Sequence, residues 1–391
     1  MTRTLVKKYI YANSGNTQYS AGQCIQFKFP DKDGFLIPES LKISYSVNIA
    51  DSGYIFGTPL YAPFLQLTTY INDNIVEQLN RYNYLTGFIL ANGLYSLSDR
   101  VSMTQDYGYG SFSNSPFSDP SVFKELNLGN TQPNAASGYG LGYSGKLECI
   151  LSHFNSPLPF KLLSPSIELI LDEFHQFTEY LNSFSINDVQ LSYDVLYDDS
   201  MPIYKQIDSF TFFSNTSPLM PNPNGNFGIP YNNPAIKYAI GAFHTFYFVG
   251  SINYSADDIT KFNGSYNLIF NNNQNYPDKT FFTQQNKRSL ILSNFKDTIR
   301  QIYKNKDLVG YIESSEYMGL PLANASFSPN KFIYGVPLGY QHDGIQIEQN
   351  TALLNISMAA NANTNANFLS MLNICYKVII DITPNGIIIS K

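Results

Sequence analysis

A glycine-rich run in the first half of the chain has nearly the spacing of a phosphate-binding loop. The run from Gly140 to Gly145 fits the dinucleotide pattern GxGxxG, and Lys146 follows as in a P-loop, but Leu147 stands where Ser or Thr is required. Both motifs need a strand before the glycines and a helix N-terminus after them, because free helix amides bind the phosphate. Here a Gly/Asn/Ser stretch precedes and residues 147–151 are typical of a strand, so we do not expect phosphate binding.

Residue types that ligate metals are few and scattered. No pair of histidines has HxH or HExxH spacing, and no pair of cysteines has CxxC spacing. A zinc ion needs three or four convergent ligands, and an odd, sparse set of cysteines is not a disulfide framework. We therefore expect no metal and no cofactor, buried free thiols, and histidines in polar loops or interfaces. These residues are Cys24, Cys149 and Cys375, and His153, His175, His244 and His342.

Adjacent carboxylates occur at three places and could suggest acid–base chemistry. Glycoside hydrolysis needs two carboxylates that face each other across a bond, whereas neighbours on a strand point to opposite faces. Acidic pairs in loops are usually turn formers, and a bound calcium ion is a lesser alternative. We assign no catalytic residue. The pairs are Asp172-Glu173, Asp198-Asp199 and Asp257-Asp258.

Basic residues gather in two places. Both groups are either solvated surface or a patch that faces anionic lipid headgroups or nucleic acid. One group surrounds an expected helix and the other lies at the N-terminus. They comprise Lys287, Arg288, Lys296, Arg300, Lys304 and Lys306, and Arg3, Lys7 and Lys8.

Composition narrows the class of protein. Charged residues make up 14% of the 391 residues and the net charge is −6. A protein that wraps nucleic acid by itself is usually basic, so this charge argues against direct nucleic-acid binding over a broad face. Aromatic residues make up 15%, which favours strands and large contact areas. No signal-peptide segment and no membrane-spanning apolar run is visible. We therefore expect a protein made and assembled in a cytoplasm, with its five Asn-x-Ser/Thr sequons (first residues Asn215, Asn253, Asn263, Asn324 and Asn355) unglycosylated.

Alternation of apolar and polar residues is the dominant pattern. It predicts half-buried antiparallel strands, separated by turns rich in Pro, Gly, Asn, Asp and Ser. Many such strands indicate a β-sandwich or barrel. The clearest runs are Ile25–Phe29, Leu41–Ile49, Ile167–Leu171, Val189–Tyr197 and Leu372–Ile380.

Helix is scarce, and one long segment has no periodicity. Apolar spacing predicts helices near 288–304 and 79–92, each against the outside of a barrel. Residues 105–145 form an aromatic, Gly-rich segment that we expect to be a long loop, either a surface tower or an arm between subunits.

The order of the strongest runs suggests an internal duplication. Each half closes with an alternating strand, Ile186–Tyr197 or Phe368–Ile382, and each of these follows two other candidate strands. The earlier candidates are Lys146–Ser152 with Ser166–Asp172, and Lys331–Val336 with Thr351–Met358. We divide the chain into an N-terminal arm (1–20), a first domain (21–200) and a second domain (201–391).

This organisation resembles the double jelly-roll major capsid proteins of tailless icosahedral viruses with an internal membrane, of the lipid-containing bacteriophage type. Two consecutive all-β halves carry the resemblance. The segment Val189–Pro202 looks like the last strand of a first roll entering the second, and Ser156-Pro157-Leu158-Pro159 looks like the loop between late strands of the first. No single motif is diagnostic.

The resemblance implies a non-enzymatic, structural all-β protein with two consecutive eight-stranded jelly rolls and a few short flanking helices. It further implies homotrimers that tile a shell in the virion, contacts with minor capsid or penton proteins, and an N-terminal arm that faces the internal membrane. It implies no sequence-specific nucleic-acid binding. Two alternatives remain: a glycan- or receptor-binding spike or lectin-like jelly roll, and a β-sandwich hydrolase.

Overall fold

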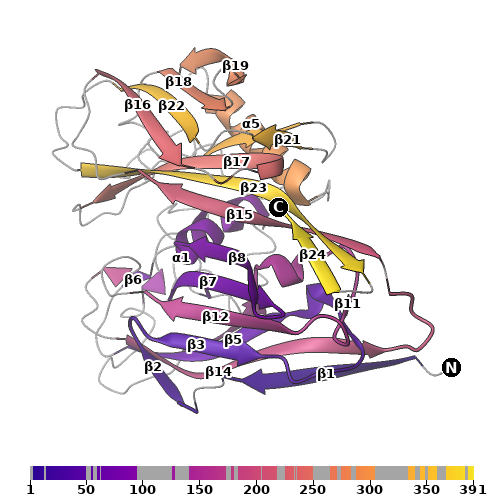
Figure 1. The fold of residues 1–391 in the computed structure, drawn as a ribbon. Coiled ribbons are helices and arrows are strands. Elements are labelled where there is room, and N and C mark those ends of the chain that lie inside the picture. The colour runs from indigo at the N-terminus through magenta and orange to yellow at the C-terminus, as the bar shows by residue number, and fades with distance from the viewer. Residues whose placement is uncertain are drawn as a thin grey trace.

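The fold was analysed in a computed structural model of the chain, and Figure 1 shows two stacked β-sandwiches. The structure describes residues 3–12, 15–49, 54–55, 60–61, 63–94, 126–127, 141–172, 178–179, 184–203, 205–217, 225–232, 234, 236–249, 265–270, 274–282, 288–303, 333–339, 344–347, 351–358, 367–383 and 386–391.

The first sandwich is built from strands that precede residue 198. Its main strands are β2 (Gln18–Ser20), β3 (Cys24–Lys28), β5 (Lys42–Ile49), β7 (Phe64–Ile71), β8 (Asn74–Asn80), β10 (Leu141–Lys146), β12 (Pro165–Leu171) and β14 (Phe184–Tyr197). One sheet has the order β2-β14-β5-β10 and the other β3-β12-β7-β8, and all of these pairs are antiparallel.

Shorter strands complete this half. The first sheet also includes β1 (Thr4–Tyr11), β4 (Phe35–Leu36) and β11 (Leu158–Pro159). A separate small sheet contains β6 (Tyr54–Ile55), β9 (Leu126–Asn127) and β13 (Thr178–Glu179).

The second sandwich repeats this arrangement. Its strands are β15 (Gln206–Thr216), β16 (Gly225–Asn232), β17 (Ile236–Val249), β18 (Ser265–Phe270), β19 (Gln274–Phe282), β20 (Ile333–Pro337), β21 (Ile345–Ile347), β22 (Thr351–Met358), β23 (Asn367–Thr383) and β24 (Gly386–Ser390). One sheet has the order β15-β23-β17-β20, with β21 and β24 added, and the other has the order β16-β22-β18-β19.

Both halves therefore share one topology. If the eight main strands of each half are numbered in chain order, the sheets read 1-8-3-6 and 2-7-4-5 in both. This is the jelly-roll arrangement, so the predicted fold class is confirmed. Among the described residues, no strand of one roll pairs with a strand of the other. The candidate strand at Lys146–Ser152 was wrong, because β10 ends at Lys146 and a short 3-10 helix, η4 (Ile150–Ser152), follows.

Alternating burial explains why these segments are strands. In β3 the pattern runs exposed, buried, exposed, buried, exposed, and in β12 every second side chain is buried. Ile25, Phe27, Ile167 and Leu169 thereby enter the core of the first roll. Cys24 is exposed on the opposite face of β3 because of the same alternation, which corrects the expectation of a buried thiol. Cys149 and Cys375 are buried and free, as predicted.

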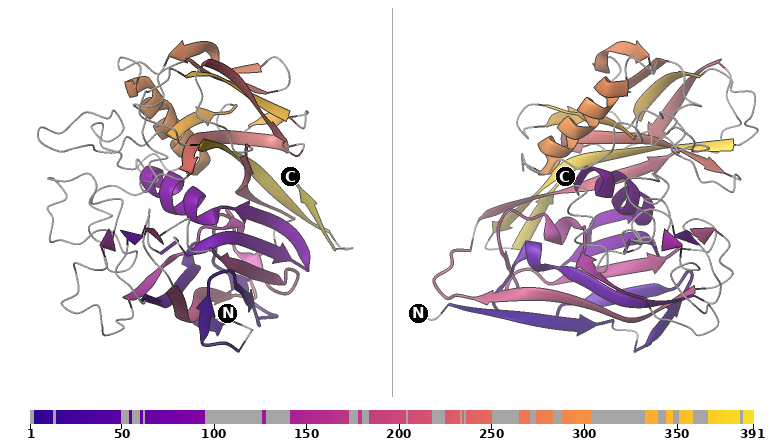
Figure 2. Two further views of the ribbon diagram at one scale, coloured as in Figure 1. Left: turned by 90° about the vertical axis from the view of Figure 1, so that its left-hand side faces the viewer. Right: turned by 180° about the vertical axis from the view of Figure 1, so that it is seen from behind.

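The helices lie between the two rolls (Figure 2). One helical segment runs through α1 (Tyr82–Tyr84), a π-helical stretch (Leu85–Leu90) and α2 (Ala91–Leu94), and the other is α5 (Arg288–Tyr303). Both predicted helices exist, although β8 takes the first residues of the range 79–92. In each roll the helix follows strand five in chain order. Among the described residues, none of the helices has the length and apolarity to cross a membrane.

The long aperiodic segment is only partly described. Residues 105–125 and 128–140 lie outside the described residues. Residues 141–145 were expected in the loop but belong to β10, whose backbone pairs with β5 from Leu141↔Val47 to Lys146↔Lys42. The cross-strand partner overrides the lack of sequence periodicity there.

Strand β1 lies along β14 and exposes most of its side chains. Ile10 is its buried residue, whereas Leu5, Tyr9 and Tyr11 are 60%, 57% and 68% exposed. Lys8 anchors the strand, because its ammonium group contacts the Asp31 carboxylate and lies 2.7 Å from the Tyr197 hydroxyl. The segment expected to be an arm is thus paired with the first roll along Thr4–Tyr11.

Candidate functional site

The junction between the two rolls is the most chemically organised region that the structure describes. On the first roll it comprises β8, η4 and the residues that flank η4; on the second it comprises β15. Two hydrogen bonds between Asn155 and Asp208 join the rolls. The backbone N–H of Asn155 donates to the backbone carbonyl of Asp208 at 3.0 Å, and the backbone N–H of Asp208 donates to the side-chain Oδ1 of Asn155 at 3.3 Å. The Ser209 hydroxyl donates to the Ile150 carbonyl at 2.8 Å.

Glu77 on β8 is a buried carboxyl at the centre of this junction. The Ile150 amide donates to both of its oxygens, at 3.0 and 3.1 Å, and the Thr69 hydroxyl donates to Oε2 at 2.8 Å. From the second roll, the Thr211 hydroxyl donates to Oε1. Burial raises the pKa of Glu77 to about 7, although these hydrogen bonds oppose the rise. One carboxyl therefore joins three segments of two rolls.

A second buried carboxyl, Glu148, lies beside His153. His153 Nε2 is 2.8 Å from Glu148 Oε2, and Lys146 Nζ is 3.4 Å from Oε1. Burial opposes ionisation of Glu148, but the Lys146 ammonium and the His153 hydrogen bond prevail and hold its pKa at about 2. Burial lowers the pKa of His153. The pair is therefore a carboxylate held close to an imidazole whose charged form is disfavoured by burial.

The imidazole of His153 also contacts the second roll. It stacks on the Phe210 ring at a centroid distance of 4.2 Å and an interplanar angle of 8°, and its Nδ1 is 3.3 Å from the Phe210 carbonyl. Tyr303 of α5 meets both rings edge-on, at 5.8 Å from His153 and 5.1 Å from Phe210. Aromatic contact thus adds to the polar ties across the junction.

Glycines allow the helices to enter the junction. A Cβ on Gly335 of β20 would lie 2.6 Å from the Cα of Phe295, and one on Gly241 of β17 would lie 2.9 Å from the Thr298 methyl. On its other side α5 meets α2, where the Ile299 side chain fills the space beside Gly93. The helix α5 is therefore clamped between a sheet of the second roll and a helix of the first.

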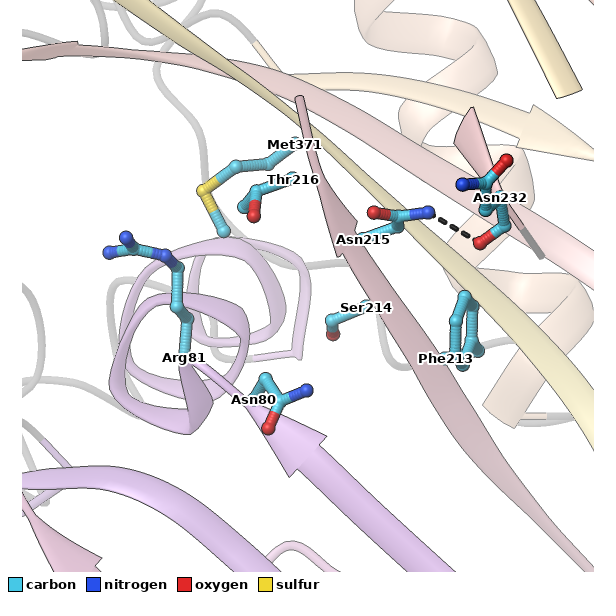
Figure 3. Close-up of a pocket in the computed structure, with 8 residues that line it drawn as sticks. All are labelled: Asn80, Arg81, Phe213, Ser214, Asn215, Thr216, Asn232 and Met371. Atoms are coloured by element: carbon cyan, nitrogen blue, oxygen red, sulfur yellow. Dashed lines mark hydrogen bonds between the residues drawn. The ribbon is translucent and has the colours of Figure 1, made fainter. Parts of the chain in front are cut away.

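A pocket of about 300 Å³ opens at one end of the junction (Figure 3). Its lining comes from both rolls, and six of the eight lining residues are of polar types. The Asn215 side-chain amide donates to the Asn232 carbonyl at 2.5 Å. Arg81 is the charged residue of the lining. The residues are Asn80, Arg81, Phe213, Ser214, Asn215, Thr216, Asn232 and Met371.

The glycine run does not have the structure that phosphate binding needs. Gly142 and Gly145 lie in β10, and within the described residues that follow, the first helical turn is the three-residue η4. Residues 147–151 were predicted to form a strand, which is wrong, because Ile150 and Leu151 belong to η4. The backbone amide of Ile150, at the start of η4, donates to the Glu77 carboxyl group.

The other candidate residues are dispersed. His153 lies at the roll interface as expected, but His244 is buried in the second roll, with Nε2 at 2.6 Å from Ser370 Oγ, so the loop-or-interface expectation is wrong for it. No group of three or more potential metal ligands occurs within the described ranges. Asp198 accepts from the Ser200 amide at 2.9 Å, as a turn former does. His175, Glu173, His342 and the pair Asp257-Asp258 lie outside the described residues.

The basic candidates are divided in the same way. Lys296 and Arg300 lie on α5, where Arg300 pairs with Asp297 at 3.2 Å, and Lys287, Lys304 and Lys306 lie outside the described residues. Sequence reasoning missed Glu77, Glu148 and Thr211. A carboxylate between the buried residues Val76 and Leu79 was the available signal for Glu77.

No family model matches the sequence, and no curated protein matches it. Solved structures do match. The PBCV-1 protein VP54, fitted into a reconstruction of the virophage Sputnik, has a TM-score of 0.62 at 9% identity, over 100% of this chain and 98% of that chain. The Faustovirus major capsid protein has a TM-score of 0.61 at 8% identity, over 97% and 90%. This structural likeness shows the fold. The chain has the double jelly-roll architecture of these viral proteins, as the resemblance noted in its sequence implied.

Proposed function

We propose that this chain is a structural major capsid protein whose homotrimers tile the shell of a tailless icosahedral virus around an internal membrane and genome. The observation that carries the proposal is the repeated strand order of the two rolls, together with a likeness to VP54 over the whole chain. Three chains with two similar rolls each give six rolls around a threefold axis, so the trimer is nearly hexagonal and can tile a surface.

The same proposal includes the domain organisation of the chain and the partners of its trimer. We place the two domains at 21–200 and 201–391, behind an arm of residues 1–20, although β2 (Gln18–Ser20) at the end of that arm already pairs with β14 of the first roll. The trimers associate with one another and with minor capsid or penton proteins in the virion, after assembly in the host cytoplasm. The role needs geometry and association rather than catalysis, and we assign no active site.

Mass measurement and negative-stain microscopy of the purified protein test the proposal. We expect a mass of three chains, about 130 kDa from the chain mass of 44.0 kDa, and hexagonal particles or sheet fragments at high concentration. A protein that stays monomeric at high concentration and binds glycans on an array would instead favour the spike or lectin-like alternative.

We propose further that the outward face of β1 contacts the viral membrane. Leu5, Lys7, Tyr9 and Tyr11 share one face of the strand and are exposed, and aromatic residues beside basic ones suit a lipid headgroup region. Lys8 is excluded from this role because Asp31 binds it.

Vesicle sedimentation tests this contact. The double substitution Arg3→Ser/Lys7→Ser is expected to reduce binding to anionic phosphatidylglycerol vesicles about thirtyfold, at roughly 1 kcal/mol for each basic residue. The matched control Lys28→Ser/Lys42→Ser removes two exposed charges from other strands and should bind like the unmodified chain. Equal binding by both double variants would contradict the assignment.

A further inference from the structure

The buried carboxyl of Glu77 is positioned to couple the two rolls. Its Oε1 accepts from Thr211 of the second roll, while its Oε2 accepts from Thr69 of the first and the Ile150 amide spans both oxygens. Each of these donors is a neutral group, and within the described ranges no direct ion pair compensates a negative charge there. Ionisation of this one group therefore changes the stability of a contact between domains.

We propose that Glu77 is a proton-operated latch between the rolls: in its uncharged form one oxygen carries the proton and donates to the threonine hydroxyl that faces it, which holds β15 against the first roll, and its ionisation loosens the junction. This inference concerns a device within one chain and does not depend on the proposed capsid role.

Four of the buried groups around Glu77 do not titrate between pH 6 and 8. Tyr82 of α1, Tyr303 of α5 and Tyr376 of β23 all have a raised pKa because they are buried. The thiol of Cys149 has a raised pKa for the same reason. These four groups therefore stay neutral in this range.

Charged neighbours act differently. Glu148 is held ionised by Lys146 and His153, and burial lowers the pKa of His153. Lys391, whose ammonium is 3.4 Å from the Ile75 carbonyl on β8, attracts the Glu77 carboxylate. A His with a lowered pKa stabilises the closed state as pH rises through its ordinary value, which is opposite in sign to the effect of Glu77.

The direction of the effect of Glu77 follows from its pKa. The pKa is about 7 in the closed junction and 4.5 in water, so closure is fully favoured below pH 4.5 and loses free energy as pH rises through 7. If opening hydrates the carboxyl, the opening equilibrium constant rises roughly tenfold between pH 6 and pH 8.

Two native cysteines can report the opening. Cys149 precedes η4 in the first roll and Cys375 lies on β23 of the second, and both are buried. In a full-length Cys24→Ser chain, each labelling rate with a thiol reagent, divided by the rate of an unfolded Cys peptide at the same pH, measures the opening. Glu77 contributes a roughly tenfold rise in this ratio from pH 6 to pH 8, which is measured as the parent chain relative to Glu77→Gln, because His153 acts in the opposite direction in both.

Variants in the same Cys24→Ser chain decide the assignment. Glu77→Gln is expected to abolish the rise, while Glu39→Gln, which neutralises an exposed carboxylate of the same roll, should keep it. Thr211→Val removes one donor that opposes the raised pKa, so the rise should move to higher pH. The latch is overturned if the parent chain and Glu77→Gln show the same pH dependence of this ratio, or if the Glu77 contribution is unmoved in Thr211→Val.

Discussion

Replacing Gly335 with Ala is expected to destabilise the protein by about 3 kcal/mol, the upper end for overpacking a well-packed core. The new Cβ would lie 2.6 Å from the Cα of Phe295 and 3.0 Å from the carbonyl oxygen of Asn294. Both are backbone atoms of α5, so no side-chain rotation relieves the clash and the helix must move away from β20. The movement would also disturb the contact of α5 with α2 at Gly93.

Urea unfolding of Gly335→Ala beside Gly22→Ala separates this clash from backbone strain. Gly22 has a φ of +75°, and no heavy atom of the described residues lies within 4 Å of its added Cβ. Its substitution therefore tests backbone strain and should cost about 1 kcal/mol. If Gly335→Ala lost no more than Gly22→Ala, the close seating of α5 on β20 would be contradicted.

Replacing Asn373 with Leu is expected to stabilise the protein by about 2 kcal/mol, as the penalty for a buried amide without hydrogen bonds disappears. Asn373 of β23 is fully buried, and among the described residues neither Nδ2 nor Oδ1 has a hydrogen-bond partner. Leu has the same number of side-chain heavy atoms and the same branching, so the replacement keeps the approximate shape.

The substitution Asn373→Asp is the matched comparison, measured by the same urea titration. It keeps the shape but introduces a charge where the described part of the chain offers no partner, so we expect a loss of about 3 kcal/mol at pH 8. Destabilisation by both Leu and Asp would mean that the amide is satisfied in solution, which would contradict the predicted gain.

The fold was largely predictable because alternation encodes it. Ile167, Leu169 and Leu171 are buried on one face of β12 as the pattern predicts, and β14 and β23 close the two halves in corresponding places. The strand at Leu141–Lys146 was not predictable, since its Gly and Ser residues carry no periodic pattern and the pairing with β5 fixes it.

The junction was not predictable from local pattern. In β23 the alternation predicted one solvent-exposed face. Asn373 and Cys375 on that face are nevertheless fully buried, because the first roll and α5 cover it. Likewise, nothing near Glu77 in the sequence indicates Thr211, which is 134 residues away. Contacts between domains depend on how whole sheets stack, and residue periodicity does not describe that.

The sheet that contains β23 and β17 is buried on both sides, by its partner sheet within the second roll and by the helices and the first roll beneath it. Both rolls therefore share the burial of this one sheet. If either roll unfolds, this sheet loses part of its cover and the other roll is destabilised. Thermal unfolding of the chain should therefore be a single cooperative transition, and the two rolls should behave as one rigid unit.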